Sequence, residues 1–151
     1  MNKSEFKIAF LSVFPPFRGG IAQFNTELYK ALESKYNIQA FNFTTQYPSF
    51  LFPGKTQYLD AKDVLPHFKS PRVISSINPL SFAKTVNAIN TFKPDVLISS
   101  YWMPFLGPSL GVVCKRIKKN VLTISLVHNA VPHEKRWGDN LFSKYYFKQQ
   151  Q

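Results

Sequence analysis

The chain has 151 residues, of which 44% are hydrophobic, enough to bury one core of ordinary size. Its formal net charge of +11 attracts anions, but charge alone does not distinguish nucleic acid, anionic lipid and a phosphorylated small molecule. A single cysteine, Cys114, excludes an intrachain disulfide, and no apolar run approaches the roughly 20 residues that cross a bilayer. We therefore expect a single-domain cytoplasmic protein without a secretory signal, in which Cys114 is buried and structural.

The chain opens with the pattern of a βαβ unit. Residues 7–13 form a nearly continuous apolar run, which is typical of a parallel strand covered on both faces. A Pro-Pro pair ends this run, and a helix is predicted from Ile21 to Ser34. Residues 38–43 read as the next strand, so the crossover between the two strands should be right-handed. The apolar residues of the helix recur at helical spacing and are Ile21, Phe24, Leu28 and Leu32.

Residues 44–76 show no sustained period and predict no regular element. After them, Asn78 is a predicted N-cap, with proline at the first helical position, and Lys93-Pro94 closes the helix. The remaining predicted elements are a strand over 95–100, a helix over 106–118, a strand over 121–127 and a helix over 141–147. This alternation predicts an α/β fold with a doubly wound, mostly parallel sheet and helices on both faces.

Ligands of such sheets bind beyond the carboxyl ends of the strands, so residues that follow strands are the informative ones. Arg18, Gly19 and Gly20 follow the first strand and lead into a helix N-terminus, where bare backbone can approach a phosphate or a sugar. A tight strand-to-helix turn explains the glycine pair equally well. Tyr101 and Trp102 follow a later strand and could stack on an acceptor, although packing over the core is the better interpretation for Trp102.

The third strand end carries His128 and Asn129, with His133 and Glu134 close behind. A strand-end imidazole can hydrogen-bond a hydroxyl or titrate near neutrality, and the structural alternative is a histidine bonded to backbone carbonyls. The spacing matches no tight zinc signature, so we expect no metal site. A serine hydrolase is not indicated either, because the chain has no G-x-S-x-G elbow.

Residues 15–22, Pro-Pro-Phe-Arg-Gly-Gly-Ile-Ala, together with the later His128-Asn129 and Pro132-His133-Glu134, carry a family resemblance. They look like the N-terminal domain of retaining glycosyltransferases of family 4, which have the GT-B fold. The resemblance runs in order from Lys7 to about Phe147. It implies metal-independent transfer of a sugar from a nucleotide-sugar donor to a glycan or lipid-linked acceptor, without any other cofactor.

By resemblance, Gly19 and Gly20 match the family's glycine loop near the donor diphosphate and the acceptor. His128 matches the catalytic histidine that contacts the donor sugar near the reacting carbon. The residues expected to bind substrate or shape the cleft are Arg18, Tyr101, Trp102, Asn129, His133 and Glu134.

The sequence departs from the family in one large respect. The resemblance calls for a second, C-terminal Rossmann-like domain with an E-x7-E pair that grips the nucleotide, and these 151 residues contain no such pair. Stabilising a leaving diphosphate needs donors from both sides of a cleft, so we expect the chain alone to be inactive.

Two further expectations concern partners. The cationic character would draw the domain to the anionic inner face of a membrane, at about 1 kcal/mol per nearby Lys or Arg. A free-standing α/β module that binds a phosphorylated ligand is the alternative function. Nucleic acid is not expected, because no helix-turn-helix, zinc-finger or RNP pattern is present.

Overall fold

The computed structural model describes residues 4–48, 57–60, 69–129 and 138–150. Five strands form one parallel sheet in the order β3-β2-β1-β4-β5. The strands are β1 (Ser4–Leu11), β2 (Tyr36–Thr45), β3 (Arg72–Ser75), β4 (Val96–Tyr101) and β5 (Leu122–Val127). The helices are α1 (Gly20–Glu33), α2 (Pro79–Phe92), α3 (Gly107–Arg116) and α4 (Asp139–Phe147), with a short 3-10 helix η2 (Pro104–Leu106) before α3.

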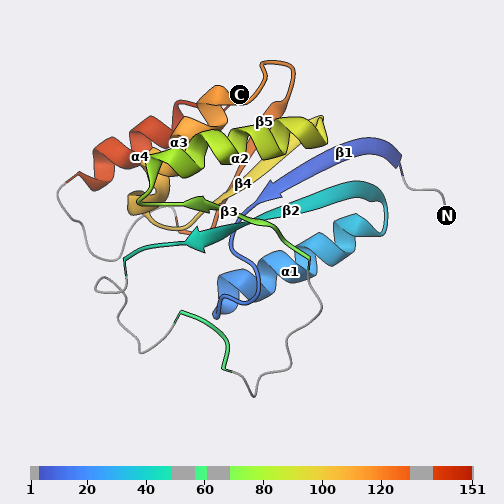
Figure 1. Ribbon diagram of the computed structural model, residues 1–151, viewed down its shortest axis with the longest axis horizontal. Helices are drawn as coiled ribbons and strands as arrows, with labels where there is room; N and C mark the ends of the chain where they lie inside the picture. The colour runs from blue at the N-terminus through green and yellow to red at the C-terminus, as the bar shows by residue number, and fades with distance from the viewer. Residues whose placement is uncertain (1–3, 49–56, 61–68, 130–137, 151) are drawn as a thin grey trace.

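Helices cover both faces of the sheet (Figure 1). Helix α1 lies on one face, and α2, α3 and α4 lie together on the other. The predicted α/β fold with a doubly wound parallel sheet is therefore confirmed. Among the described residues, every helix is too short or too polar to cross a membrane.

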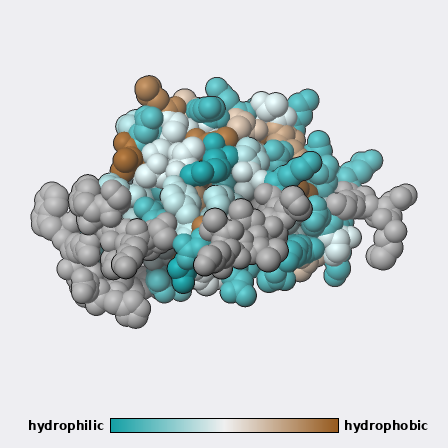
Figure 2. Space-filling model, turned by 60° about the horizontal axis from the view of Figure 1, so that its bottom comes forward, coloured by the Kyte–Doolittle hydropathy of each residue, from teal (hydrophilic) through white to brown (hydrophobic). Residues whose placement is uncertain are grey.

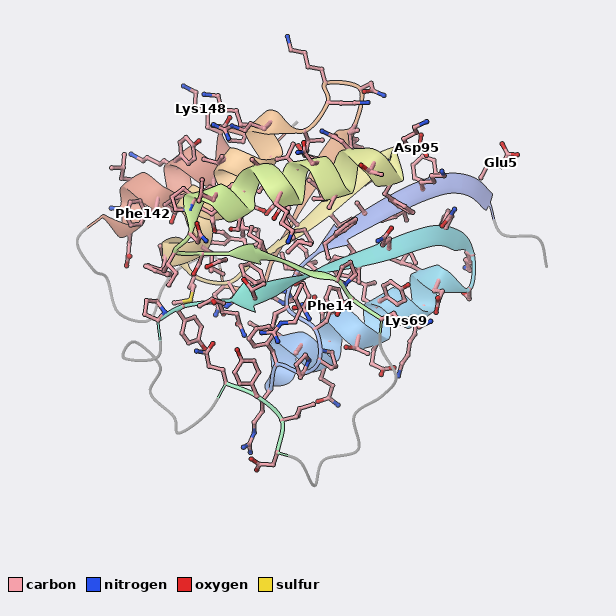
Figure 3. All side chains as sticks on the ribbon, viewed as in Figure 1. Glu5, Phe14, Lys69, Asp95, Phe142 and Lys148 are labelled. Carbon is pink, nitrogen blue, oxygen red and sulfur yellow. The ribbon has the colours of Figure 1, made fainter. Side chains whose placement is uncertain are left out.

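Both faces of the sheet bury aromatic side chains. Phe14 lies between the sheet and α1 (Figure 3), where its ring meets Phe10 at 5.2 Å and Tyr29 at 6.4 Å between centroids. On the other face the fully buried Tyr146 of α4 places its hydroxyl 2.6 Å from Ser99 Oγ and 2.9 Å from Ser125 Oγ. The Tyr146 hydroxyl thus ties α4 to both β4 and β5. Cys114 is buried on this face, as expected from the sequence.

Helix α2 begins and ends where its capping residues predict. The Asn78 side chain accepts a hydrogen bond from the Leu80 amide at 3.1 Å, and Pro79 takes the first helical position. At the other end Lys93 adopts a left-handed conformation, with φ of 55°. The local sequence predicts both ends of α2 because each cap involves only residues that are neighbours in the chain.

Strand β3 falls in the region where no element was predicted. It has four residues and pairs with β2 in an irregular register. The Arg72 guanidinium holds it in place, donating from Nε to the Phe43 carbonyl at 2.9 Å and from an Nη to the Thr44 carbonyl at 2.8 Å. A strand of four residues is too short to show a periodic pattern. Its position depends on hydrogen bonds to β2, whose residues are distant in sequence, so no local pattern predicts this strand.

The predicted apolar face of α1 is partly wrong. The buried residues of this helix are Ala22, Asn25 and Thr26, whereas Phe24 is 50% exposed. The N-terminal half of α1 packs closely against the loop that follows β1, and only small or hydrogen-bonded side chains fit there. Phe24 is instead turned toward the end of β5, where it contacts His128.

Glycines allow α3 and α4 to approach each other closely. A Cβ added at Gly107 would collide with the backbone carbonyl of Phe142, and one added at Gly111 would lie 2.6 Å from the Tyr145 ring. The first contact is with backbone, which cannot move aside without displacing α4.

We predict that Gly107→Ala destabilises the fold by about 1–3 kcal/mol, because the added methyl overpacks the contact between α3 and α4. Urea unfolding followed by circular dichroism measures this change. Gly20→Ala is the matched control, since its Cβ meets no atom within 4 Å. Equal midpoints for both variants would contradict the proposed close contact.

Candidate functional site

The sheet has its topological switch point between β1 and β4. From β1 the chain continues to β2 on one side, and it later returns to β4 on the other. The loops that leave the carboxyl ends of these two strands diverge, and the space between them is where ligands bind in open α/β sheets. The candidate site is therefore built from the residues that follow β1, β4 and β5.

Asn25 of α1 joins the two strand ends at this point. Its Nδ2 donates to Ser12 Oγ at 2.6 Å and to the Val13 carbonyl at 3.2 Å, both just beyond β1. Its Oδ1 accepts from Ser100 Oγ of β4 at 3.4 Å. All three polar side chains are buried, so α1 is held rigidly over the switch point.

The glycine pair forms the entry to α1. Gly19 has φ of 125°, a conformation that favours glycine, and Gly20 is the first helical residue. The helix has no side-chain cap and no acidic residue in its first turn, so its first N–H groups can donate hydrogen bonds to an acceptor outside the helix. A Cβ added at either glycine meets open space. The sequence prediction of an accessible backbone turn at a helix N-terminus agrees with this geometry.

An open groove of about 520 Å³ runs from the glycine pair along one flank of α1. Its volume is in the range of small-molecule sites. The wall includes exposed Arg18, whose backbone N–H donates to the Gln57 carbonyl at 2.8 Å. In Figure 2, turned so that the lower side of Figure 1 comes forward, the coloured residues are mostly hydrophilic to neutral, with a few hydrophobic spots. Along α1 the groove is also lined by Gln23, Thr26, Glu27 and Lys30.

His128 follows β5 at the same edge of the sheet. Its backbone N–H donates to the Tyr101 carbonyl at 2.8 Å, which extends the pairing of β4 with β5 by one residue. The Phe24 ring stands edge-on to the imidazole at 5.3 Å. Nε2 is buried and has no hydrogen-bond partner within the described part of the chain. Burial lowers the pKa of His128 from its ordinary value of 6.5, so the ring is neutral near pH 7.

The glycine pair and His128 thus border the same helix. Phe24 lies about one turn after Gly20, so the helix N-terminus and the strand-end imidazole lie on neighbouring parts of the site. A helix N-terminus can bind an anion, and a neutral imidazole can donate or accept a hydrogen bond with a hydroxyl. The arrangement can therefore hold a ligand that carries both a phosphate and hydroxyl groups.

The other sequence candidates divide into two groups. Tyr101 is 1% exposed, stacks on Tyr146 at 4.9 Å and hydrogen-bonds Ser143 Oγ at 2.7 Å. Trp102 is 8% exposed and packs against Phe43. These placements favour packing over substrate contact for both rings. Asn129 is exposed at the site, and its Nδ2 donates to the Trp102 carbonyl at 3.3 Å.

His133 and Glu134 lie outside the described residues. Within the ranges that are described, no three His, Cys, Asp or Glu side chains gather in a way that could hold a metal ion.

The sequence matches no protein-family model, no curated protein and no solved structure. The function therefore has to be argued from the residues of the site.

Sequence reasoning missed the buried polar set beneath the site, Ser12, Asn25 and Ser100. A polar residue at the position of Asn25 in a predicted amphipathic helix, among apolar neighbours, was the available signal. Its partners come from strand ends up to 75 residues away, which no local pattern reveals.

We predict that Phe24→Ala raises the pKa of His128 toward 6.5, because removing the ring readmits water to the imidazole. Imidazole NMR titration measures the shift, with His128→Gln identifying the signal. Phe6→Ala, which removes a comparably exposed ring from β1, is the control and should leave the titration unchanged.

The same linkage predicts a pH dependence of stability. The folded-state pKa is below the unfolded value, so the unfolded chain binds the proton first and stability falls as the pH drops below about 6.5. For each protein, the free energy of unfolding at pH 5 is compared with its own value at pH 7. This decrease should be smaller for Phe24→Ala than for the wild type. An identical loss in both proteins would contradict the burial argument.

Proposed function

We propose that this chain is the acceptor-side domain of a retaining GT-B glycosyltransferase that resembles family 4. The reaction would transfer a sugar from a nucleotide-sugar to a glycan or lipid-linked acceptor. One observation carries the proposal: the bare helix N-terminus at Gly19-Gly20 and the strand-end His128, which contacts Phe24 one turn later, both border the first two turns of α1 at the carboxyl edge of the sheet. A phosphate-linked sugar needs both kinds of group close together.

In this proposal the residues have separate tasks. The first N–H groups of α1 hold the donor diphosphate, and the positive end of the helix dipole stabilises its charge as the sugar leaves. His128, kept neutral by burial, hydrogen-bonds a hydroxyl of the donor sugar near the reacting carbon. Arg18, exposed beside the glycine pair, adds a positive charge facing the diphosphate.

The acceptor is assigned to the groove along α1. Its wall combines an amide, a hydroxyl and charged groups from Gln23, Thr26, Glu27 and Lys30, the donors and acceptors that sugar hydroxyls require. The net charge of +11 would bring a lipid-linked acceptor at an anionic leaflet within reach. The groups that grip the nucleotide would come from a second domain, so this chain alone should bind ligands without transferring sugar.

A binding module for a phosphorylated ligand is the second candidate. The same helix N-terminus and Arg18 favour this function, because both can bind phosphate and His128 is not needed for that. The two functions differ in whether His128, the residue proposed to contact the sugar, also contacts the ligand.

Titration with UDP-glucose and GDP-mannose, followed by two-dimensional NMR, tests the proposal. We expect at least one nucleotide-sugar to shift the signals of Gly19, Gly20 and His128 with a common saturation curve. Gly20→Asp should weaken this binding at least about tenfold, because the new carboxylate occupies the anion position at the helix N-terminus.

Asn140→Asp is the matched control, since it adds the same charge at the first turn of α4, which lies on the face of the sheet opposite α1. It should leave the affinity unchanged. Inorganic phosphate that shifts the glycine signals, with no nucleotide-sugar shifting His128, would favour the binding module instead. Absence of binding by every nucleotide-sugar and by phosphate would contradict both functions.

A further inference from the structure

A second pocket lies at the amino ends of the strands, opposite the edge that carries the glycine pair. It is formed where α2 leads into β4 and α3 leads into β5, the place that Asp95 marks in Figure 3. The Leu122 N–H donates to the Asp95 carbonyl at 3.0 Å and holds these two turns side by side. The volume of about 190 Å³ is below that of sites for drug-sized ligands, so the pocket suits a small ion or a headgroup.

The pocket carries a surplus of positive charge. Lys93 and Lys118 line it from the two turns, and both are exposed. The acidic group in the lining, the Asp95 carboxylate, already accepts the Lys7 backbone N–H at 2.7 Å. Within the part of the chain that the structure describes, neither lysine ammonium has an ion-pair or hydrogen-bond partner. This balance attracts an anion, and it is reinforced by the exposed neighbours of Lys118 in the chain, Lys115, Arg116 and Lys119.

Hydrogen-bond capping of the two helices does not require the lysine side chains. At the end of α2 the Asn90 carbonyl accepts the Lys93 backbone N–H at 3.2 Å. At the end of α3 the Val113 carbonyl accepts the Ile117 backbone N–H at 3.1 Å. Backbone N–H groups therefore satisfy these carbonyls, and the ammonium groups stay available to a ligand.

The backbone of Lys93 indicates a task for its side chain. Lys93 ends α2 in the left-handed region, with φ of 55°, where glycine is the usual residue because a side chain is strained there. Among the described residues it is the one non-glycine with a positive φ. Strain of this kind is concentrated at functional positions. Lysine at this position, in place of glycine, brings an ammonium group to the pocket.

We propose that this pocket binds a phosphate group. Lys93 and Lys118 supply the positive charge, and the side-chain amides of Asn90 and Asn120 line the same pocket and can donate hydrogen bonds to phosphate oxygens. Inorganic phosphate and the headgroup of an anionic lipid share this chemistry. The proposal is independent of the proposed sugar transfer, because the pocket lies at the other end of the sheet.

Titration with sodium phosphate at constant ionic strength, followed by two-dimensional NMR, tests the pocket. We expect saturable shifts of the amide signals of Lys93, Lys118 and Asn120. Lys93→Gly with Lys118→Gln should weaken this binding at least about tenfold, because both ammonium groups are removed. Shifts of Gly19 and Gly20 in the same titration report the separate helix N-terminus, and the variant should leave them unchanged.

The Lys93→Gly substitution also separates binding from folding. Glycine relieves the left-handed strain at the end of α2, so the urea midpoint of Lys93→Gly should not fall. Lys35→Gln with Lys84→Gln is the matched control for charge, because it also removes two exposed lysines, from the turn after α1 and from α2. It should leave phosphate binding in the pocket unchanged.

Vesicles of phosphatidylglycerol distinguish the two sources of phosphate. Vesicle binding that the pocket variant weakens more than the control variant assigns the pocket to a lipid headgroup. Saturable phosphate binding in the pocket, with equal vesicle binding by the two double variants, assigns it to a soluble phosphate. The proposal is overturned if neither probe shows binding that depends on Lys93 and Lys118, or if the control variant weakens binding as much as the pocket variant.

Discussion

The parallel pairing of β1 with both β2 and β4 is the constraint on which the rest of this structure depends. Parallel neighbours cannot be joined by a tight turn, so each connection must cross a face of the sheet, and its handedness decides which face. The chain leaves β1 in one direction and returns to its other side, which places α1 on one face and α2 and α3 on the other. The same reversal separates the loops at the carboxyl ends and creates the place for a ligand.

Buried amides keep that place open in a defined shape. Asn25 connects the ends of β1 and β4, and Asn42 of β2 accepts from the Phe14 amide and donates to the Phe14 and Pro15 carbonyls. These side chains supply hydrogen-bond partners to backbone N–H and C=O groups of the loop after β1, which would otherwise be buried without partners. The glycine pair and His128 are therefore presented by a scaffold that is in place before any ligand binds, which lowers the entropic cost of binding.

Helix α1 presents different groups on its two flanks. The groove lies along the flank of α1 that carries Gln23 and Glu27, and Phe24 turns away from it toward His128 at the end of β5. Phe24 also covers the imidazole of His128.

The sequence alone determined the fold class and the main elements, because each depends on local properties. The apolar run of β1, the Asn78 cap of α2 and the break at Lys93-Pro94 act through neighbours in the chain, and the element bounds agree to within a few residues. Sequence also placed Gly19, Gly20 and His128 at strand ends. Only the tertiary structure decided which elements lie side by side. Strand β3 depends on Arg72 reaching β2, Tyr101 is held in the core by α4, and Phe24 turns to His128 across the end of the sheet. Contacts between residues distant in sequence leave no periodic signal, since either partner alone is compatible with many positions in the fold.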